Sequence, residues 1–286
     1  MNYRHAFHAG NFADVFKHAI LVRIVEYLKQ KPGAFRVIDT HAGPGFYDLS
    51  GDAAGRTGEW RGGIGRVIDA DLPAQAAALL APWLDIVRRF NQGHPFRYYP
   101  GSPALVRELL RGRDRLTAIE LHPADAFTLK TRFAGDYKVR VIELDGWLAL
   151  GAHLPPKEKR GLVLVDPPFE KEGEFERMAD GLAAAHRRWP GGTYALWYPI
   201  KDARAHAAFR DRLASSGIPK IMDVVFGIRA HAEGGPLDGC GMVVVNPPYP
   251  LEAELRTILP VLRDLMADGD GAGFDIVRLT PERLPA

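Results

Sequence analysis

The sequence predicts an α/β fold in which helices cover both faces of a buried, mostly parallel sheet. Short runs of apolar and β-branched residues recur along the chain with little polar alternation, as in strands buried on both faces. Segments with the apolar spacing of helices separate most of these runs, which is the order of elements in three-layer α/β proteins. The 286 residues are 47% hydrophobic, so they supply enough apolar side chains for such a core. No apolar run approaches the roughly 18 residues of a membrane span.

The first predicted elements are a helix and a short strand. Residues 12–30 have the pattern of an amphipathic helix, and Pro32-Gly33 marks its end because neither residue continues a helix well. Residues 36–40 (RVIDT) are rich in β-branched side chains and lead into the glycine-rich segment HAGPG.

The middle of the chain alternates strands with helices. RLTAIE at 115–120 is apolar enough for a central strand, and a helix is expected at 123–134. KVRVIEL at 138–144 is the next strand, and GLVLV at 161–165 is a continuous apolar run of the kind found inside parallel sheets.

The last third continues the pattern. We expect a helix at about 172–188, a strand at 193–199 (TYALWYP) and a helix at 203–215. Strands at 219–227 and 241–245 close the series.

Residues 46–100 interrupt this rhythm. They hold glycine-rich and arginine-bearing stretches and an alanine-rich helical segment at 73–90, with no clear strand. We interpret 46–100 as an inserted helical subdomain, and residues 1–45 and 101–286 as one core domain with an N-terminal helix.

Charge is distributed unevenly although the net charge is only +2. The first 115 residues hold 16 Lys/Arg against 11 Asp/Glu, and the remainder holds 21 against 24. A basic segment is typical of surfaces that bind polyanions, but this excess is equally compatible with ordinary solvated faces.

Three further features of the sequence argue against a disulfide-stabilised protein, a metalloprotein and a secreted protein. One cysteine, Cys240, excludes an intrachain disulfide framework and a Cys-rich zinc site. His5 and His8 lack a carboxylate partner at ligand spacing, so we expect no metal. The first residues carry His, Arg and Asn where a signal peptide needs an apolar run. We expect a cytoplasmic monomer without a membrane partner.

A glycine-rich turn follows the first predicted strand. In VIDTHAGPG, Gly43 and Gly45 allow the tight turn at the carboxyl end of a strand, where open α/β sheets bind ligands. The pattern alone is weak, because glycine-rich turns also occur without a ligand, and it lacks the Lys-Ser/Thr of a P-loop.

Acidic residues end the next two strands. Glu120 ends RLTAIE, the position of a ribose-hydroxyl acceptor in nucleoside-binding folds. Asp145-Gly146 follows KVRVIEL, where an acid can accept from an adenine amino group. Each acid alone is more often a helix N-cap than a ligand residue, but the ordered series Asp39, Glu120 and Asp145 strengthens the interpretation as a nucleoside site.

A proline motif after the next predicted strand indicates the type of reaction. Asp166-Pro167-Pro168-Phe169 follows the apolar run at 161–165 and resembles the [D/N]-P-P-[Y/F/W] motif of S-adenosylmethionine-dependent methyltransferases that modify planar amino groups. A side-chain oxygen and a proline-fixed carbonyl accept from an exocyclic NH2, which turns the nitrogen lone pair toward the methyl group, and the aromatic ring stacks on the base.

A second copy of the pattern, Asn246-Pro247-Pro248-Tyr249, follows the run at 241–245. Chain order argues against it, because the reactive motif should follow the fourth core strand. We expect Asn246 to end a final hairpin strand, away from the cofactor edge, and to be structural.

Taken together, NYRHAFHAGNFADVFKH, IDTHAGPG, YPGSP, IELHP and VDPPFE resemble the RlmJ family, bacterial methyltransferases that form N6-methyladenosine in 23S ribosomal RNA. The resemblance runs from residue 1 to about 250. It implies a Rossmann-like class I methyltransferase core with a small helical insertion, S-adenosyl-L-methionine as cofactor, and 23S rRNA as partner.

The resemblance also implies site residues. Those expected to bind the cofactor are His18, His41, Gly43, Ser102, Glu120, Asp145, Gly146 and Asp166. Asp166, Pro167, Pro168 and Phe169 are expected to form the catalytic motif, and Tyr3 and Lys17 to contact the RNA. Phe169 stands where relatives often carry Tyr, so stacking is retained and any role of a phenol hydroxyl is not.

The sequence therefore predicts methylation of the N6 amino group of a specific adenosine in 23S rRNA. The adenosine must be single-stranded or flipped out to reach such a site. Three alternatives stay open: a glutamine-N5 protein methyltransferase, a DNA adenine methyltransferase, and a non-catalytic RNA-binding protein on the same fold.

Overall fold

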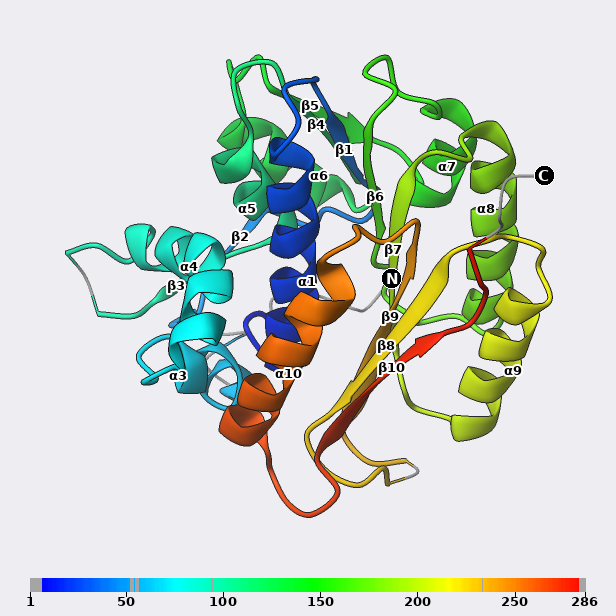
Figure 1. The fold of residues 1–286 in the computed structure, drawn as a ribbon. Helices are drawn as coiled ribbons and strands as arrows, with labels where there is room; N and C mark the ends of the chain where they lie inside the picture. The colour runs from blue at the N-terminus through cyan, green and yellow to red at the C-terminus, as the bar shows by residue number, and fades with distance from the viewer. Residues whose placement is uncertain (1–6, 52–53, 55–56, 94, 233, 283–286) are drawn as a thin grey trace.

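The computed structural model describes residues 7–51, 54, 57–93, 95–232 and 234–282. One sheet runs through the molecule (Figure 1), and its strands are β1 (Arg36–Asp39), β4 (Arg115–Glu120), β5 (Val139–Glu143), β6 (Gly161–Val165), β7 (Thr193–Pro199), β8 (Ile221–Gly227), β9 (Gly239–Val245) and β10 (Gly273–Arg278). They lie in the order β10-β8-β9-β7-β6-β1-β4-β5. The predicted fold class is confirmed.

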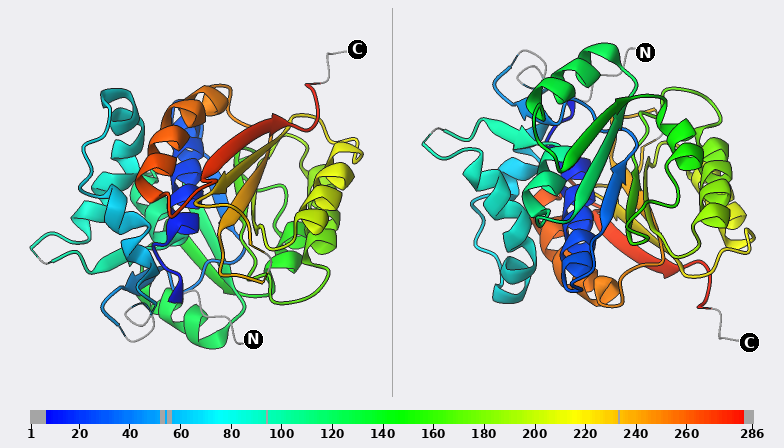
Figure 2. Two further views of the ribbon diagram at one scale, coloured as in Figure 1. Left: turned by 90° about the horizontal axis from the view of Figure 1, so that it is seen from below. Right: turned by 90° about the horizontal axis from the view of Figure 1, so that it is seen from above.

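Helices cover both faces of this sheet, as the views from below and above also show (Figure 2). One face carries α1 (Phe12–Lys29), α5 (Ser102–Leu109), α6 (Pro123–Arg132) and α10 (Leu251–Met266). The other carries α7 (Gly146–Ala152), α8 (Glu174–Arg188) and α9 (Ala203–Ala214). Adjacent strand residues alternate between the layers: Val37 belongs to the cluster under α1, and Ile38 to the cluster under α8.

Five neighbouring strands of the sheet, β5, β4, β1, β6 and β7, run parallel to one another, and the remaining strand pairs are antiparallel. β5-β4, β4-β1, β1-β6 and β6-β7 pair in parallel, so these strands all end at one edge. β9 runs antiparallel between β7 and β8, and β10 pairs antiparallel with β8. The expectation that the strand at 241–245 is the last one was wrong, because α10 and β10 follow it.

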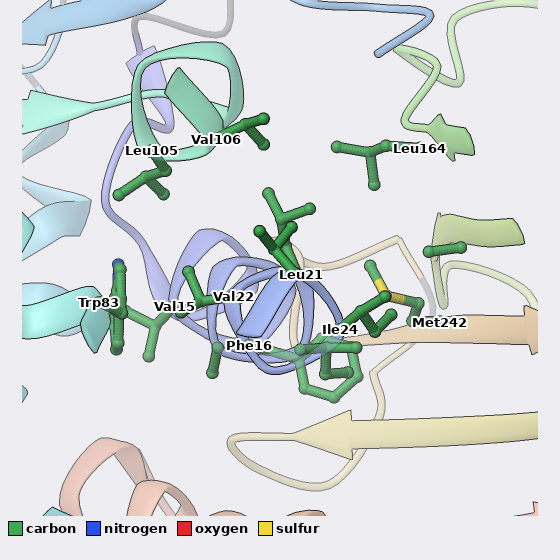
Figure 3. Close-up of a cluster of buried hydrophobic side chains, with 14 of the residues drawn as sticks. Val15, Phe16, Leu21, Val22, Ile24, Trp83, Leu105, Val106, Leu164 and Met242 are labelled. Carbon is green, nitrogen blue, oxygen red and sulfur yellow. The ribbon is translucent and has the colours of Figure 1, made fainter. Parts of the chain in front are cut away.

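Helix α1 lies almost entirely inside the molecule. Fourteen of its eighteen residues are buried, so the expected amphipathic character was wrong although the helix is present. α4 (Ala74–Arg89), α5 and α10 pack on the sides that the sheet leaves uncovered. Figure 3 shows Phe16 and Leu21 of α1 among side chains from the sheet and the surrounding helices. Full burial of each such side chain contributes about 1.5–3 kcal/mol.

The segment 46–100 contains α4, the short helix α3 (Ile64–Val67) and the 3-10 turn η2 (Glu59–Arg61). It also contains two short strands, β2 (Phe46–Asp48) and β3 (Tyr98–Pro100), which pair antiparallel at its two ends. The expectation of no strand here was therefore wrong. The pairing of β2 with β3 brings the two ends of the segment together. Whether the segment is a separate domain stays a prediction.

Candidate active site

Two cavities meet at the carboxyl ends of the parallel strands. The first, which we call the strand-end cavity, has a volume of about 560 Å³ and lies where β1, β4, β5 and β6 end. The second, the adjoining cavity, has a volume of about 470 Å³ and lies beside the first turns of α1 and the ends of β7 and β8. Lys17, Asp166 and Pro168 line both cavities. A group held in one cavity can therefore meet a group held in the other beside Asp166.

The residues predicted to bind the cofactor come together. All of them line the strand-end cavity: His18, His41, Gly43, Ser102, Glu120, Asp145, Gly146 and Asp166. Several different segments of the chain supply them, and the parallel direction of the strands explains why they converge.

The glycine turn after β1 fits closely against its surroundings. Gly43 has a φ of +61°, and a Cβ there would lie 2.7 Å from the Tyr47 hydroxyl oxygen. Its N–H donates to Glu120 Oε2 at 2.8 Å, so the turn is tied to the end of β4. Glycine is required here for both its backbone conformation and its size.

Glu120 faces the cavity from the end of β4. Besides Gly43, the N–H of His122 donates to it, to Oε1 at 2.7 Å. Burial raises the pKa of Glu120 although these N–H donors lower it. Each oxygen thus holds one backbone donor and keeps a second lone pair, which suits acceptance from two neighbouring hydroxyl groups.

Asp39 and Ser102 form a buried pair behind the glycine turn. The Ser102 hydroxyl donates to Asp39 Oδ2 at 2.6 Å, and Oδ1 has no partner in the part of the chain that the structure describes. Burial raises the pKa of Asp39 to about 7 although the hydrogen bond from Ser102 lowers it. The carboxyl group of Asp39 is therefore partly protonated at neutral pH.

Asp145 caps α7 and also lines the cavity. It accepts from the N–H of Trp147 at 2.9 Å, and Arg177 of α8 lies 3.1 Å from its other oxygen. The N-cap explanation thus applies to Asp145 without excluding a ligand role. A Cβ on Gly146 would lie 2.1 Å from the carbonyl oxygen of Thr40, so α7 begins in direct contact with the turn after β1.

The two histidines approach the cavity from different sides. His18 is buried on α1, with Nδ1 2.7 Å from the Tyr99 hydroxyl oxygen. Burial lowers the pKa of His41 to about 4, so its ring is neutral near pH 7. That ring stands edge-on to Trp147. A neutral imidazole does not repel a cationic ligand.

Asp166 is held by a buried lysine. Lys17 Nζ lies 2.5 Å from Asp166 Oδ2 and 2.8 Å from Asp14 Oδ1. Although burial lowers the pKa of Lys17, the two carboxylates raise it further, so the ammonium stays charged. Lys17 is therefore a buried lysine and not a solvated one. Among the described residues no donor reaches Asp166 Oδ1, which leaves that oxygen available to a ligand.

The rest of the proline motif divides between the cavity and the core. Pro167 and Pro168 line the strand-end cavity. The Phe169 ring packs edge-on against Phe175 and Trp197, with ring centroids 5.1 and 6.3 Å away, and it is not among the residues that line either cavity. Stacking of Phe169 on a base would need its ring to turn out of this cluster, and that role stays a prediction.

Asn246 lies at the opposite end of the strands from the two cavities. Because β9 runs antiparallel to β7, its end is remote from the ends of β1, β4 and β6. The Asn246 amide donates to the carbonyl oxygens of Pro190 and Gly192, each at 2.8 Å. These bonds support the expected structural role of Asn246.

The predicted RNA contacts are only partly visible. Tyr3 lies outside the described residues, and Lys17 lines both cavities. Among the arginines of the segment 46–100, Arg88 pairs with Asp85 at 3.1 Å and Arg89 with Glu108 at 3.4 Å. Neighbouring carboxylates thus occupy part of this surface.

Several cavity residues were not predicted from the sequence. Trp147, Arg177 and Glu174 line the strand-end cavity from α7 and α8. Glu174 is buried, and its Oε2 has no partner within the described ranges. Asp14 orients Lys17 from one turn earlier on α1. The (i, i+3) spacing of Asp14 and Lys17 is the sequence feature that could have indicated this pair. Because the same spacing is common on the exposed face of a helix, it did not identify a buried pair.

Among the residues that the structure describes, no three His, Cys, Asp or Glu side chains group as metal ligands. Within the same ranges, no helix is both long and apolar enough to cross a bilayer.

Comparisons with known proteins identify one family over most of the chain. The family model described as "Ribosomal RNA large subunit methyltransferase D, RlmJ" matches residues 32–276. The chain is 38% identical over 283 residues to "Ribosomal RNA large subunit methyltransferase J" of Escherichia coli, covering 99% of this chain and 100% of that protein. It is 39% identical over 285 residues to the protein of the same name from Haemophilus influenzae, with the same coverage.

A solved structure has the same fold. The crystal structure of a Legionella pneumophila protein superposes with a TM-score of 0.86 at 32% identity, covering 95% of this chain and 98% of that one. The arrangement of strands and helices described above is thus shared with an experimentally determined relative.

Proposed function

The chain belongs to the RlmJ family of large-subunit ribosomal RNA methyltransferases, and on that premise we propose that it transfers a methyl group from S-adenosyl-L-methionine to the N6 amino group of one adenosine in 23S rRNA. A cytoplasmic location follows from that substrate as part of the same proposal. The family match over the full length does not favour the protein-glutamine, DNA or non-catalytic alternatives.

The strand-end cavity supports the choice of cofactor. S-adenosylmethionine supplies an electrophilic methyl group on a sulfonium sulfur. Glu120 offers two acceptor oxygens for the ribose hydroxyls, and Asp145 offers an acceptor for the adenine amino group. The neutral His41 and the surplus of carboxylates in the lining suit a ligand that carries a positive sulfur. The cavity volume of about 560 Å³ lies within the range of cofactor sites.

The observation that carries the proposal is the wall of Lys17, Asp166 and Pro168 between the two cavities. Methyl transfer needs an acceptor nitrogen directly in line with the methyl group, and a shared wall provides one place where two separately held groups meet. We place the target adenosine in the adjoining cavity. Such a base must leave its stack to enter, so we expect an unpaired or flipped-out nucleotide.

Asp166 then orients the acceptor. Its Oδ2 is fixed by Lys17, and Oδ1 accepts one N–H of the amino group. The carbonyl oxygen of Pro167 accepts the other, because a proline-rich turn offers acceptors without an added donor. Both hydrogen bonds hold the nitrogen lone pair toward the methyl group, and Asp166 is placed to take the proton that the nitrogen releases after transfer.

The test is methyl transfer from radiolabelled S-adenosylmethionine to deproteinised 23S rRNA, followed by nucleoside digestion and chromatography. We expect the label in N6-methyladenosine at one position. Label in another nucleoside, or in a protein glutamine when ribosomal proteins are added, would contradict the assignment.

A further inference from the structure

A third cavity lies at the amino ends of the parallel strands, opposite the active site. Its volume is about 440 Å³, and it lies where β1, β4 and β5 begin, at the top of the molecule in Figure 1. The same strand, β4, joins it to the active site: Arg115 lines the third cavity, and Glu120 lines the strand-end cavity. We call it the basic cavity.

The lining of the basic cavity is entirely cationic among its charged groups. Within the described part of the chain, its lining contains no Asp or Glu and five Lys or Arg residues: Arg36, Arg115, Lys138, Arg140 and Lys157. Arg36 is bound in a bidentate pair to Glu158, with N–O distances of 2.8 and 2.9 Å. Within the described residues, neither Arg140 nor Lys157 has a carboxylate partner, and both are exposed.

An exposed aromatic ring stands among these cations. Tyr137 is 69% exposed, and the Arg115 guanidinium lies 5.3 Å from the centre of its ring. His153 also lines this cavity, and burial together with the charges of Arg140 and Arg36 lowers its pKa. Cations that bind phosphates beside an aromatic ring that stacks on a base are the usual elements of RNA-binding surfaces.

The active-site cavities have a different charge balance. Among the residues that the structure describes, six Asp or Glu and three Lys or Arg line the strand-end cavity, and four of each line the adjoining cavity. These described linings do not concentrate the positive charge on which RNA affinity depends. The insertion arginines Arg88 and Arg89 are paired with acids.

We propose that the basic cavity is a second RNA-binding site, which holds the phosphate backbone of the substrate rRNA away from the methylated nucleotide and stacks an unpaired base on Tyr137. The proposal rests on the proposed function for the identity of the RNA. The length of β4 separates the two sites by about 17 Å, since each strand residue advances roughly 3.4 Å. A folded rRNA segment covers both sites, whereas an oligonucleotide of a few residues at the active site does not.

The test reverses two exposed cations, Arg140→Glu with Lys157→Glu, in the full-length protein. Arg187→Glu with Arg188→Glu is the control, because these exposed arginines of α8 give the same change in net charge elsewhere. The measurement is the dissociation constant of a transcribed 23S rRNA domain, by filter binding at several salt concentrations without cofactor. We expect a rise of about tenfold or more and a salt slope smaller by about 1.5, as for the loss of two phosphate contacts.

Unchanged affinity and slope in the Arg140/Lys157 variant, or an equal loss in the control pair, would overturn the proposal. Tyr137→Ala should weaken RNA binding by roughly five- to a hundredfold, as the loss of one stacked base does, and Tyr137→Phe should restore it. Equal binding by Tyr137→Ala and the unaltered protein would remove Tyr137 from the site.

Turnover separates this proposal from the proposed function. With the Arg140/Lys157 variant, we expect a raised KM for the long rRNA and an unchanged kcat. The rate on a short oligonucleotide that contains the target adenosine should not change. If the unaltered protein methylates no rRNA, the proposed function fails, and the binding measurements still decide whether the basic cavity holds RNA.

Discussion

Lys17, on the buried helix α1, lies beside Asp166, the residue that we propose orients the acceptor amino group. Its ammonium lies between Asp14 and Asp166 and is only 5% exposed. A buried charge pair of this kind contributes little net stability, because desolvation offsets attraction, but it fixes the geometry of its members. The position of Asp166 Oδ1 is therefore set before any substrate arrives, which lowers the cost of aligning the amino group.

The first prediction concerns Asp166. Asp166→Ala should lower the methylation rate about 10²-fold or more, because the acceptor for the amino group is lost. Although Asp166 also lines the strand-end cavity, cofactor affinity should change far less than the rate, because Glu120 and Asp145 remain for the nucleoside and Lys17 keeps Asp14 as its partner. Single-turnover kinetics and calorimetry measure the two effects. The matched variant is Asn246→Ala, which should retain the rate since the side-chain amide of Asn246 donates to the carbonyls of Pro190 and Gly192, away from the strand-end cavity. The reverse result would mean that the other proline motif is the reactive one.

The second prediction concerns Glu120. Hydrogen bonds to a charged acceptor are worth about 1.5–3 kcal/mol, so Glu120→Ala should raise the cofactor dissociation constant roughly ten- to a hundredfold. Glu143→Ala is the control, because Glu143 is the register partner of Glu120 on β5 but pairs with Lys130 at the surface. Equal affinities of the two variants in calorimetry would show that Glu120 does not contact the cofactor.

The third prediction follows from the pKa of about 7 at Asp39. Unfolded, this carboxyl group titrates near 3.9, so between about pH 4 and 7 the folded protein binds the extra proton. Asp39 therefore makes the free energy of unfolding fall as pH rises through this window. His41, with a pKa of about 4, contributes the opposite slope below about pH 6.5.

The comparison of the protein with its Asp39→Asn variant isolates this contribution. Relative to the variant, the unaltered protein should be more stable at pH 5 than at pH 8 by on the order of 2 kcal/mol. Urea unfolding at both pH values measures it. A stability difference that is the same at both pH values would show that the pKa of Asp39 is not raised.

At the scale of elements, the start of α7 sets the width of the strand-end cavity. A Cβ on Gly146, the first residue of this helix, would meet the carbonyl oxygen of Thr40, whereas a Cβ on Gly151 in the same helix would point into open space. The two glycines thus occupy one short helix in opposite environments. Gly146 was predicted from the sequence as a ligand residue, and its packing shows a further reason for glycine.

The fourth prediction uses this contrast. Gly146→Ala should destabilise the fold and weaken cofactor binding, because a Cβ placed 2.1 Å from the Thr40 oxygen forces α7 away from the turn after β1. Gly151→Ala should leave binding unchanged and raise stability by up to about 1 kcal/mol, since alanine favours helices. Thermal unfolding and calorimetry on both variants test this. Similar behaviour of the two would contradict the described packing.

The sequence predicted those helices and strands whose residue pattern points to one type of element, and it missed those whose pattern contains conflicting residues. β4 and β6 have the predicted bounds because apolar runs flanked by turns identify buried strands. α10 was missed although it spans sixteen residues, and Pro260 in its middle is normally a sign of a helix end. The antiparallel pairing of β9 with β8 agrees with the hairpin expected for this strand, and only its place as the final strand was wrong.

At the scale of the whole molecule, the parallel sheet explains which residues of the strand-end cavity could be predicted from the sequence. Residues at the end of a parallel strand, such as Glu120, or directly after one, such as Asp166, were predictable because strand ends converge at one edge. Asp14, Glu174 and Arg177 lie on helices far apart in the sequence, and their meeting depends on tertiary packing that no local pattern encodes. The basic cavity was missed for the same reason, since its cations come from the beginnings of three strands and one loop.

Helix α1, with sheet on one side and helices around the rest, has a consequence for the dynamics of the catalytic groups. The residues from Val15 to Val22 in this helix are all buried, so the hydrogen–deuterium exchange of their backbone amides should proceed only through global unfolding. The amides of β5, at the rim of the sheet, should exchange by smaller local openings. Native-state exchange followed by mass spectrometry distinguishes the two, and fast exchange around Lys17 would contradict it. If α1 exchanges as expected, Lys17 and His18 keep their places as long as the molecule is folded, and heat or denaturant should abolish methylation and protection of these amides in one transition.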